Sequence, residues 1–347
     1  MTRQTRCRSW RTALSAGAAF GLSLGGVVLA AEPSITLTDS TDAVGGKSTL
    51  HDAEMDAAFQ TLGVSTTKAG SSSSSTRKLA ISELPLSSLS VEARGKAQAV
   101  LDNLAMFRRL PTLSFEVDPE VYSFFLENPD IAVSTWRAME ISKFQLKEVE
   151  QGCYAADAGD GSIGRIEILQ HSPDSTLIHC DGSFKSPLLP RPIVARSLMR
   201  LQTSFAKEAD GRIIGTHSGD VFVEFPSQAV ETVAKVISPV SHSIADRNFK
   251  QITLFAHLMT QAMAKHPGWI EVIGNKLDGV SAEQRLQFLE VSARSYVMSR
   301  KRLAGADPNK PFTLDEVLSP FRLSEDAVPR PMPMPLSIRA GTAVLRD

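Results

Sequence analysis

The sequence predicts an α+β fold in which a curved antiparallel sheet packs on a long C-terminal amphipathic helix, with helical additions at both ends of this domain. Between residues 144 and 225, apolar residues recur with a period of two and turn residues separate the apolar runs, which is typical of antiparallel strands. After Pro226 the spacing becomes that of an α-helix, and one apolar stripe extends to Met263. Together these patterns predict a sheet followed by one dominant helix.

The first 30 residues are typical of a cleavable secretory signal peptide. Residues 1–12 carry four arginines and no acidic residue, and residues 13–30 are apolar or small. Val28-Leu29-Ala30 is a well-formed cleavage tripeptide, so cleavage is expected before Ala31. An uncleaved anchor is the alternative, but four glycines make the segment weakly apolar. We therefore expect a protein exported to the periplasm or to the cell exterior.

Charge argues against a nucleic-acid partner. Removal of residues 1–30 lowers the basic residues from 37 to 33 against 38 acidic ones, so the mature chain carries a net charge near −5. Proteins that bind nucleic acid usually need a basic surface to neutralise phosphates.

Composition divides the mature chain into four parts. Residues 31–85 are rich in Ser, Thr and Gly, which predicts a disordered tether; an O-glycosylated stalk is the alternative. Residues 86–280 are expected to form the α+β globular domain. A helical extension over 281–328 and a Pro-rich disordered tail over 329–347 follow.

The first ordered elements are predicted to be helices around one strand. Apolar spacing predicts a helix over 91–109, and a short strand is expected over 112–117. Asp118-Pro119 begins the next helix, because Asp is a good N-cap and Pro suits the first turn. A further helix is expected over 130–139.

Five strands are predicted between residues 144 and 225. Turns rich in Asp, Gly, Ser and Pro separate them at 157–161, 172–174 and 210–211. The long helix then spans 246–265. A capping box formed by Ser281 and Gln284 opens the helical extension.

The glycine-rich loop near residue 160 carries no clear cofactor or metal site. Gly159-x-Gly161-x-x-Gly164 matches the dinucleotide fingerprint by letter, but a strand follows it where that motif requires a helix. Asp157 and Asp160 lie in the same loop without the distal Glu of a calcium loop. We interpret the loop as a hairpin turn and expect no cofactor and no metal.

Histidines offer no clear catalytic constellation. His257 lies on the polar side of the long helix and is expected at the surface. His179 and His217 fall in predicted strands, where a buried histidine is more often a hydrogen-bonded part of the scaffold than a catalyst. We assign no catalytic residue.

Cys153 and Cys180 are the cysteines of the mature chain, in a compartment that permits disulfides. The predicted hairpins place both opposite Ile166, two strand spacings or about 9–10 Å apart. A disulfide needs Cα atoms within about 7 Å. The sequence therefore leaves undecided whether Cys153 and Cys180 form a disulfide, because either the bridge or the predicted register is wrong.

The order of elements over residues 112–268 resembles the START-like helix-grip fold of the polyketide cyclase and lipid-transfer superfamily. That superfamily usually has six central strands where five are predicted here, with residues 185–192 as one place for the sixth. The resemblance implies a cavity between sheet and helix that holds an apolar or amphipathic ligand; the alternative is a solid core. The residues expected to line it are Met199, Leu201, Phe205, Val223, Phe225, Phe249, Ile252, Met259 and Met263.

Three functions follow from these patterns. The first is an exported, non-catalytic module that binds an apolar or amphipathic small molecule such as a lipid. The second is an envelope-structural or protein-interaction domain with a solid core, partnered by another envelope protein. The third is a hydrolase or cyclase that uses scattered cavity residues, with His179, His217 and Asp181 as its candidates.

Overall fold

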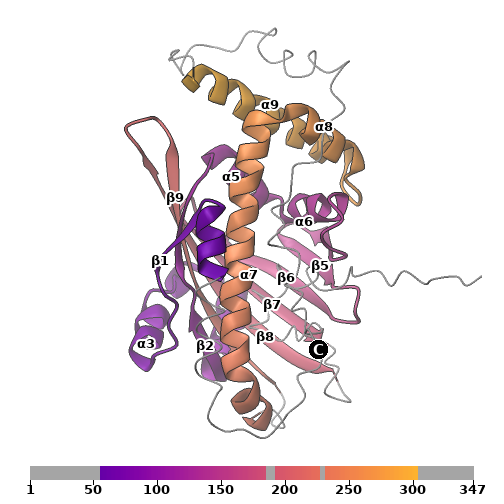
Figure 1. Ribbon diagram of the computed structural model, residues 1–347. Coiled ribbons are helices and arrows are strands. Elements are labelled where there is room, and N and C mark those ends of the chain that lie inside the picture. Colours follow the sequence, from indigo (N-terminus) through magenta and orange to yellow (C-terminus); the bar gives the residue numbers. More distant parts are fainter. Residues whose placement is uncertain (1–54, 185–191, 227–230, 304–347) are drawn as a thin grey trace, which may run out of the picture.

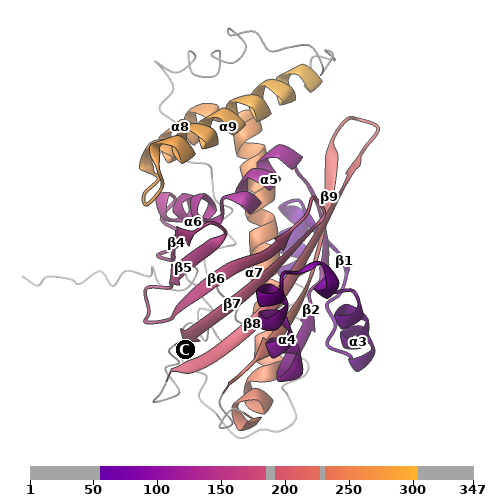
Figure 2. The same ribbon diagram turned by 180° about the vertical axis from the view of Figure 1, so that it is seen from behind.

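The computed structural model describes residues 55–184, 192–226 and 231–303. The predicted signal peptide, the tether before residue 55, the tail and residues 304–328 of the helical extension lie outside this range. Within it the protein is α+β, with one nine-stranded antiparallel sheet and helices on both faces (Figures 1 and 2). Among the described residues, no helix has the length and apolar character needed to cross a membrane.

The strands follow the order β1-β3-β9-β8-β7-β6-β5-β4, and β2 also pairs with β9. Since β2 and β3 pair with different parts of β9, they lie one after the other along its edge. The bounds are β1 (Val64–Lys68), β2 (Leu104–Arg109), β3 (Thr112–Glu116), β4 (Gln145–Glu150), β5 (Cys153–Asp157), β6 (Ile163–His171), β7 (Ser175–Phe184), β8 (Ile193–Lys207) and β9 (Ile213–Glu224).

Six strands, not five, lie between residues 145 and 224. The additional strand arises from the tight turn at Gln151-Gly152, which separates β4 from β5. Gly152 has a φ of 70°, a value that glycine adopts readily and other residues do not. The prediction of five strands was wrong because it took this short turn as strand.

Two layers of helices cover the sheet. We call the face of the sheet that packs against α5, α6 and α7 the inner face, and the face that packs against α3 and α4 the outer face (Figures 1 and 2). The helices α8 and α9 pack at one end of α7. The bounds are α3 (Ser74–Ser82), a 3-10 turn η1 (Leu86–Ser88), α4 (Val91–Asp102), α5 (Pro119–Glu127), α6 (Pro129–Ala138), α7 (Glu231–Lys265), α8 (Pro267–Lys276) and α9 (Ala282–Leu303).

The helix predicted over 91–109 ends at Asp102, and its last part is the strand β2. Val100 and Phe107 are both buried in the outer-face cluster, but they reach it from different elements. Because Val100 and Phe107 are seven residues apart, their spacing is also that of one face of an α-helix. Pairing with β9 decides the outcome, because it supplies backbone hydrogen bonds that the spacing of apolar residues does not reveal.

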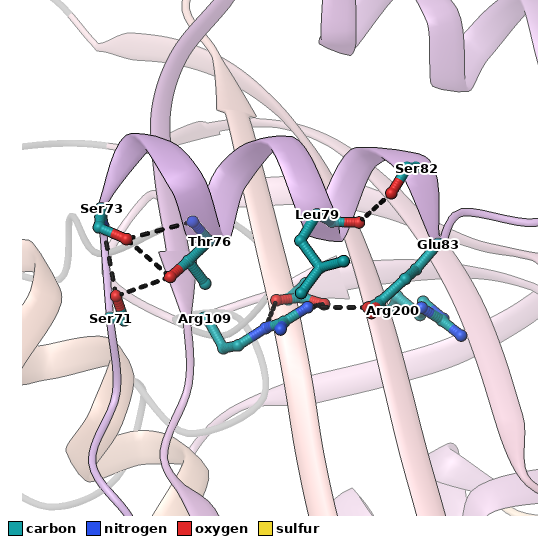
Figure 3. Close-up of polar contacts among 9 residues, drawn as sticks. Ser71, Ser73, Thr76, Leu79, Ser82, Glu83, Arg109 and Arg200 are labelled. Carbon is teal, nitrogen blue, oxygen red and sulfur yellow. Dashed lines mark hydrogen bonds and ion pairs between the residues drawn. The ribbon is translucent and has the colours of Figure 1, made fainter.

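Residues 55–85 are ordered, so the predicted tether is wrong over this part. Residues 55–61 are helical, and β1 extends the sheet beyond β3 with Val64 only 1% exposed. The serine run contributes to this order (Figure 3). Ser71 pairs with Arg109 through backbone hydrogen bonds of 2.8 Å in both directions, and the Ser73 hydroxyl accepts the Thr76 N–H at 3.1 Å, which caps α3.

Candidate functional site

A cavity of about 170 Å³ lies between the inner face and the helices α5, α6 and α7. Helix α7 contacts β1, β2 and β3, while α6 contacts β4, so the middle strands face a space that neither helix fills. Its lining is Tyr122, Phe125, Leu126, Pro129, Ala132, Val133, Trp136, Leu146, Tyr154, Ile166, Ile168, Thr176, Ile178, Met199, Leu201, His217, Phe249, Ile252, Phe255 and Ala256.

Aromatic rings form the helical wall of the cavity. The Phe255 ring lies 5.2 Å from Phe125 and 5.5 Å from Trp136, centroid to centroid, both in edge-on geometry. Phe249 lies 4.5 Å from the His217 ring. These contacts join α5, α6, α7 and β9 around the space, and such edge-on pairs add stability beyond the area they bury.

One end of the cavity carries a chain of neutral hydrogen-bonding groups. The Tyr122 hydroxyl lies 2.6 Å from Thr203 Oγ1 and 3.3 Å from His217 Nε2. On the other side of the ring, His217 Nδ1 lies 3.1 Å from Thr253 Oγ1, and the Thr253 hydroxyl donates to the Phe249 carbonyl at 2.9 Å. All four side chains are buried.

Burial keeps these groups uncharged. It lowers the pKa of His217 to about 3 and raises the pKa of Tyr122 to about 12, against which the hydrogen bond from Thr203 acts only partly. The imidazole is therefore neutral at physiological pH. A histidine in this state serves as a hydrogen-bonding group and not as a proton shuttle near pH 7.

The nine predicted lining residues divide into three groups. Met199, Leu201, Phe249 and Ile252 do line the cavity. Val223 and Phe225 belong to the same core without lining the space. The other three residues lie elsewhere.

Phe205 is 36% exposed, and its ring contacts Tyr122 at 5.7 Å. Met259 and Met263 are buried in a second cluster, formed with α5, α8 and α9, which we call the helical cluster. The physical reason is the length of α7: its last turns run past the sheet and contact α8 and α9 (Figure 1). The stripe along this helix therefore serves two different cores.

Several lining residues were missed at the level of sequence. Tyr122, Trp136 and Phe255 come from three helices that only the tertiary fold brings together. Ile166 and Ile168 had a visible signal, since they alternate in one strand and so share a face. Their assignment to the cavity needed the knowledge that this face is the inner one.

The three residues of the hydrolase or cyclase hypothesis do not form one site. His217 lies on the inner face. His179 and Asp181 share the opposite face, because the neighbouring Cys180 packs in the inner core and side chains alternate along β7. The sheet therefore separates His217 from the other two.

His257 is buried, contrary to the surface position predicted for it. Its Nδ1 lies 2.7 Å from the Glu116 carbonyl oxygen and donates to it. The turn before β1 covers the ring so closely that a Cβ at Gly63 would lie 2.5 Å from Nε2. Lys250, on the same side of α7, is also buried and pairs with Asp56. The N-terminal segment thus covers the polar side of α7.

Cys153 and Cys180 are not joined by a disulfide. Cys180 lies opposite Ile166 as predicted, but Cys153 lies opposite Glu167, one residue from its expected partner. That shift of one residue places Cys153 on the outer face and Cys180 on the inner face. Distance and direction both oppose a bond between them.

The glycine-rich loop is a hairpin turn between β5 and β6. Gly159 and Gly161 have φ values of 75° and 97°, and the Asp157 and Asp160 carboxylates accept the N–H groups of Gly159 and Ser162 at 2.7 and 2.8 Å. In the part of the chain that the structure describes, no three metal-binding side chains gather at one place.

A second hollow, of about 600 Å³, lies over the ends of β4 to β8 on the outer face. Arg165 and Asp181 are half exposed within it, and Ile163 is 56% exposed. It is larger but open to solvent, and a ligand there would stay largely hydrated. The inner cavity, which is less open and more apolar, is the better candidate site.

Comparisons with known proteins add little. No family model matches the chain, and no curated protein matches it. A conserved protein from Geobacillus kaustophilus is similar in structure, at 13% identity over 40% of this chain and 93% of its own, with a TM-score of 0.24. An uncharacterized protein from Rhizobium leguminosarum is similar at 12% identity over 42% and 95%, also with a TM-score of 0.24. Scores this low carry no argument.

Proposed function

We propose that this protein is an exported, non-catalytic module that binds an apolar or amphipathic small molecule in the inner cavity. The apolar lining of this cavity carries the proposal. Among the described residues, its lining holds no Lys, Arg, Asp or Glu, and its few polar side chains are neutral tyrosine, threonine and histidine. Ligand sites of this kind are mostly apolar, with a few polar groups that orient the ligand. Export depends on residues 1–30, whose pattern supports it.

The helix-grip resemblance is part of the same proposal. The strand before α5 and α6, the six strands β4 to β9 and the long helix α7 follow the order of that fold. The six central strands agree with the number usual in the superfamily. The order of elements thus supports the START-like interpretation and, with it, a ligand between sheet and helix.

The size of the cavity limits what it encloses. An apolar cavity of about 150 Å³ can hold one benzene ring, so this one holds a single ring or a short alkyl segment. Several lining residues, among them Leu126, Ile168 and Ile252, are half-buried, so the cavity is partly open to solvent. A longer amphiphile such as a lipid would extend out through this opening.

Two matched variants of α7 test the proposal. Ala256 lines the cavity, whereas Ala262 is buried in the helical cluster. Ala256→Leu should fill the space, weaken binding of a small aromatic probe by about tenfold or more and leave stability unchanged or raise it by about 0.5–2 kcal/mol. Ala262→Leu should overpack its cluster, cost about 1–3 kcal/mol and leave probe affinity unchanged.

Calorimetric titration of the purified chain with the probe, together with urea unfolding of both variants, gives the readout. A parent protein that binds no probe would contradict the proposal and favour the envelope-structural alternative. Equal probe affinity in the parent and in Ala256→Leu would show that binding occurs elsewhere.

A further inference from the structure

We infer that the inner cavity selects uncharged ligands that carry a hydroxyl group, and that the Tyr122 oxygen accepts the hydrogen bond from that hydroxyl. This inference rests on the proposed function, because it names the chemistry of the ligand in the same cavity. It follows from the direction of the hydrogen bonds around His217.

The direction is set at Thr253. Its hydroxyl donates to the Phe249 carbonyl, an atom that can only accept, so the Thr253 oxygen must accept from His217. His217 therefore carries its hydrogen on Nδ1. Because burial holds the imidazole neutral, its Nε2 has no hydrogen and needs a donor.

Tyr122 is the donor that Nε2 meets. Its hydroxyl lies 3.3 Å away, and its single hydrogen is used in this bond. Thr203, at 2.6 Å, then donates to the Tyr122 oxygen. Tyr122 then has no hydrogen left for a ligand, and its oxygen keeps accepting capacity.

A ligand hydroxyl can therefore donate to the Tyr122 oxygen without breaking the hydrogen bonds that join Thr203, Tyr122, His217 and Thr253. A ketone of the same shape, which only accepts, would have to take the Tyr122 hydrogen from His217 and leave Nε2 buried without a partner. Such an orphaned group costs more than one ordinary hydrogen bond contributes. Anions meet no cation among the described lining residues, so their desolvation stays uncompensated.

The other two polar side chains of the lining are Thr176 and Tyr154. Thr176 is hydrogen-bonded to another residue, and Tyr154 lies near carboxylates. The Thr176 hydroxyl bonds with His171 Nδ1 at 2.9 Å. Burial raises the pKa of Tyr154, and the carboxylates of Glu148 in β4 and Asp130 in α6 raise it further, so Tyr154 lies near negative charge. Tyr154 therefore provides a matched control for Tyr122.

Four small aromatic probes test the inference: 1-phenylethanol, acetophenone, cumene and benzoate. They have the same number of non-hydrogen atoms and differ in whether they donate, accept, do neither or carry charge. By calorimetric titration at pH 7, the alcohol should bind about three- to tenfold more tightly than the ketone, the range of one hydrogen bond. Benzoate should bind more weakly than cumene by about tenfold or more.

Variants locate the effect. Tyr122→Phe should abolish the alcohol-to-ketone preference and weaken the alcohol more than cumene, whereas Tyr154→Phe should keep the preference. If Tyr122→Phe does not fold, Thr203→Val is the second test: it removes one donor to Tyr122 but keeps the phenol, so the alcohol should still be preferred, and loss of the preference would contradict the assignment to Tyr122.

The outcomes separate the two claims. If none of the probes binds, cumene included, the proposed function fails. If cumene binds while the ketone binds as tightly as the alcohol, ligand binding stands and the hydroxyl inference is overturned. Benzoate affinity equal to that of cumene would overturn the selection for uncharged ligands.

Discussion

The two faces of the sheet bury apolar residues in different ways. On the outer face, α4 places Ala93 and Ala97 toward strand residues Leu177, Leu198 and Phe222, each at most 1% exposed. On the inner face, α6 and α7 present Trp136, Phe249 and Phe255 around a space of about 170 Å³.

The difference shows what the contact residues do. Small residues let a helix approach closely, and large ones hold it away, because interaxial distances depend on the side chains at the contact. Alanines close the outer face, whereas the aromatic rings of the inner face pack against one another edge-on and span the gap between helices. The same sheet thus has a solid side and a hollow side.

The largest expected loss of stability comes from breaking the buried ion pair between Arg109 and Asp220 on the outer face. Arg109 donates to both carboxylate oxygens of Asp220 at 2.7 and 2.9 Å, and the Asp220 side chain is 2% exposed. Arg109 also pairs with Glu83, which ties α3 to the sheet (Figure 3). Arg109→Ala leaves a buried carboxylate unpaired and should cost about 3–5 kcal/mol in urea unfolding.

The control for Arg109 is an exposed pair on the same face. Arg165 and Glu150 lie 3.2 Å apart, with both side chains more than half exposed. Arg165→Ala should cost less than about 1 kcal/mol. Equal costs for the two arginines would show that the Asp220 site is hydrated in solution.

A pair of leucines on β8 compares the faces directly. Leu198 is 0% exposed on the outer face, and Leu201 is a half-buried residue of the cavity lining. Leu198→Ala should cost about 2–5 kcal/mol, and Leu201→Ala roughly half of that or less, because Leu201 already borders empty space. Similar losses in thermal unfolding would mean that the inner face is packed as tightly as the outer one.

Acid should weaken the inner face through His217. Its folded pKa of about 3 lies below its ordinary value of 6.5, so between these values the unfolded chain binds a proton that the folded chain does not. Stability is complete above pH 6.5 and falls as the pH drops toward 3. Between pH 7 and pH 5 the loss should be about 2 kcal/mol. Urea titrations of the parent and of His217→Gln check it, and a variant with the same pH slope would contradict it.

The smallest effect concerns the cap of α3. Ser73→Ala removes the acceptor for the Thr76 N–H and should cost about 0.5–2 kcal/mol. Ser82, at the other end of the helix, donates to the Leu79 carbonyl from an exposed position, and Ser82→Ala should change stability by less than about 0.5 kcal/mol. Limited proteolysis should cut the Ser73 variant faster within α3. An unchanged rate would mean that the ion pairs of Glu83 hold the helix without its cap.

The sequence was most informative where periodic burial dominates. The strands β6 to β9 and the second half of α7 were predicted, because alternation and helical spacing follow directly from which side chains are buried. The prediction began the helix at residue 246, whereas it begins at Glu231. Of the site, Met199, Leu201, Phe249 and Ile252 could be found in this way. Their neighbours Met259 and Met263 could not be told apart from them, because spacing along a helix does not reveal where the sheet beneath it ends.

The rest depends on contacts between distant segments. The strand β1 has one buried residue, Val64, and is ordered by its hydrogen bonds to β3, which local composition cannot show. The polar face of α7 looked solvent-exposed because the partners of Lys250 and His257 come from residues 56–63 and from β3. Tyr122, the centre of the polar end of the cavity, meets Thr203 and His217 only in the folded chain.

The outermost strand β4 affects how two molecules of this protein meet. Two copies could extend the sheet by pairing their β4 strands about a two-fold axis, which keeps equivalent faces on the same side. The two registers that overlap most of this strand would place Lys147 against Lys147 or Glu148 against Glu148. Like charges directly opposite each other destabilise such a pair. The edge therefore disfavours a dimer formed by joining two sheets at β4, even at high local concentration.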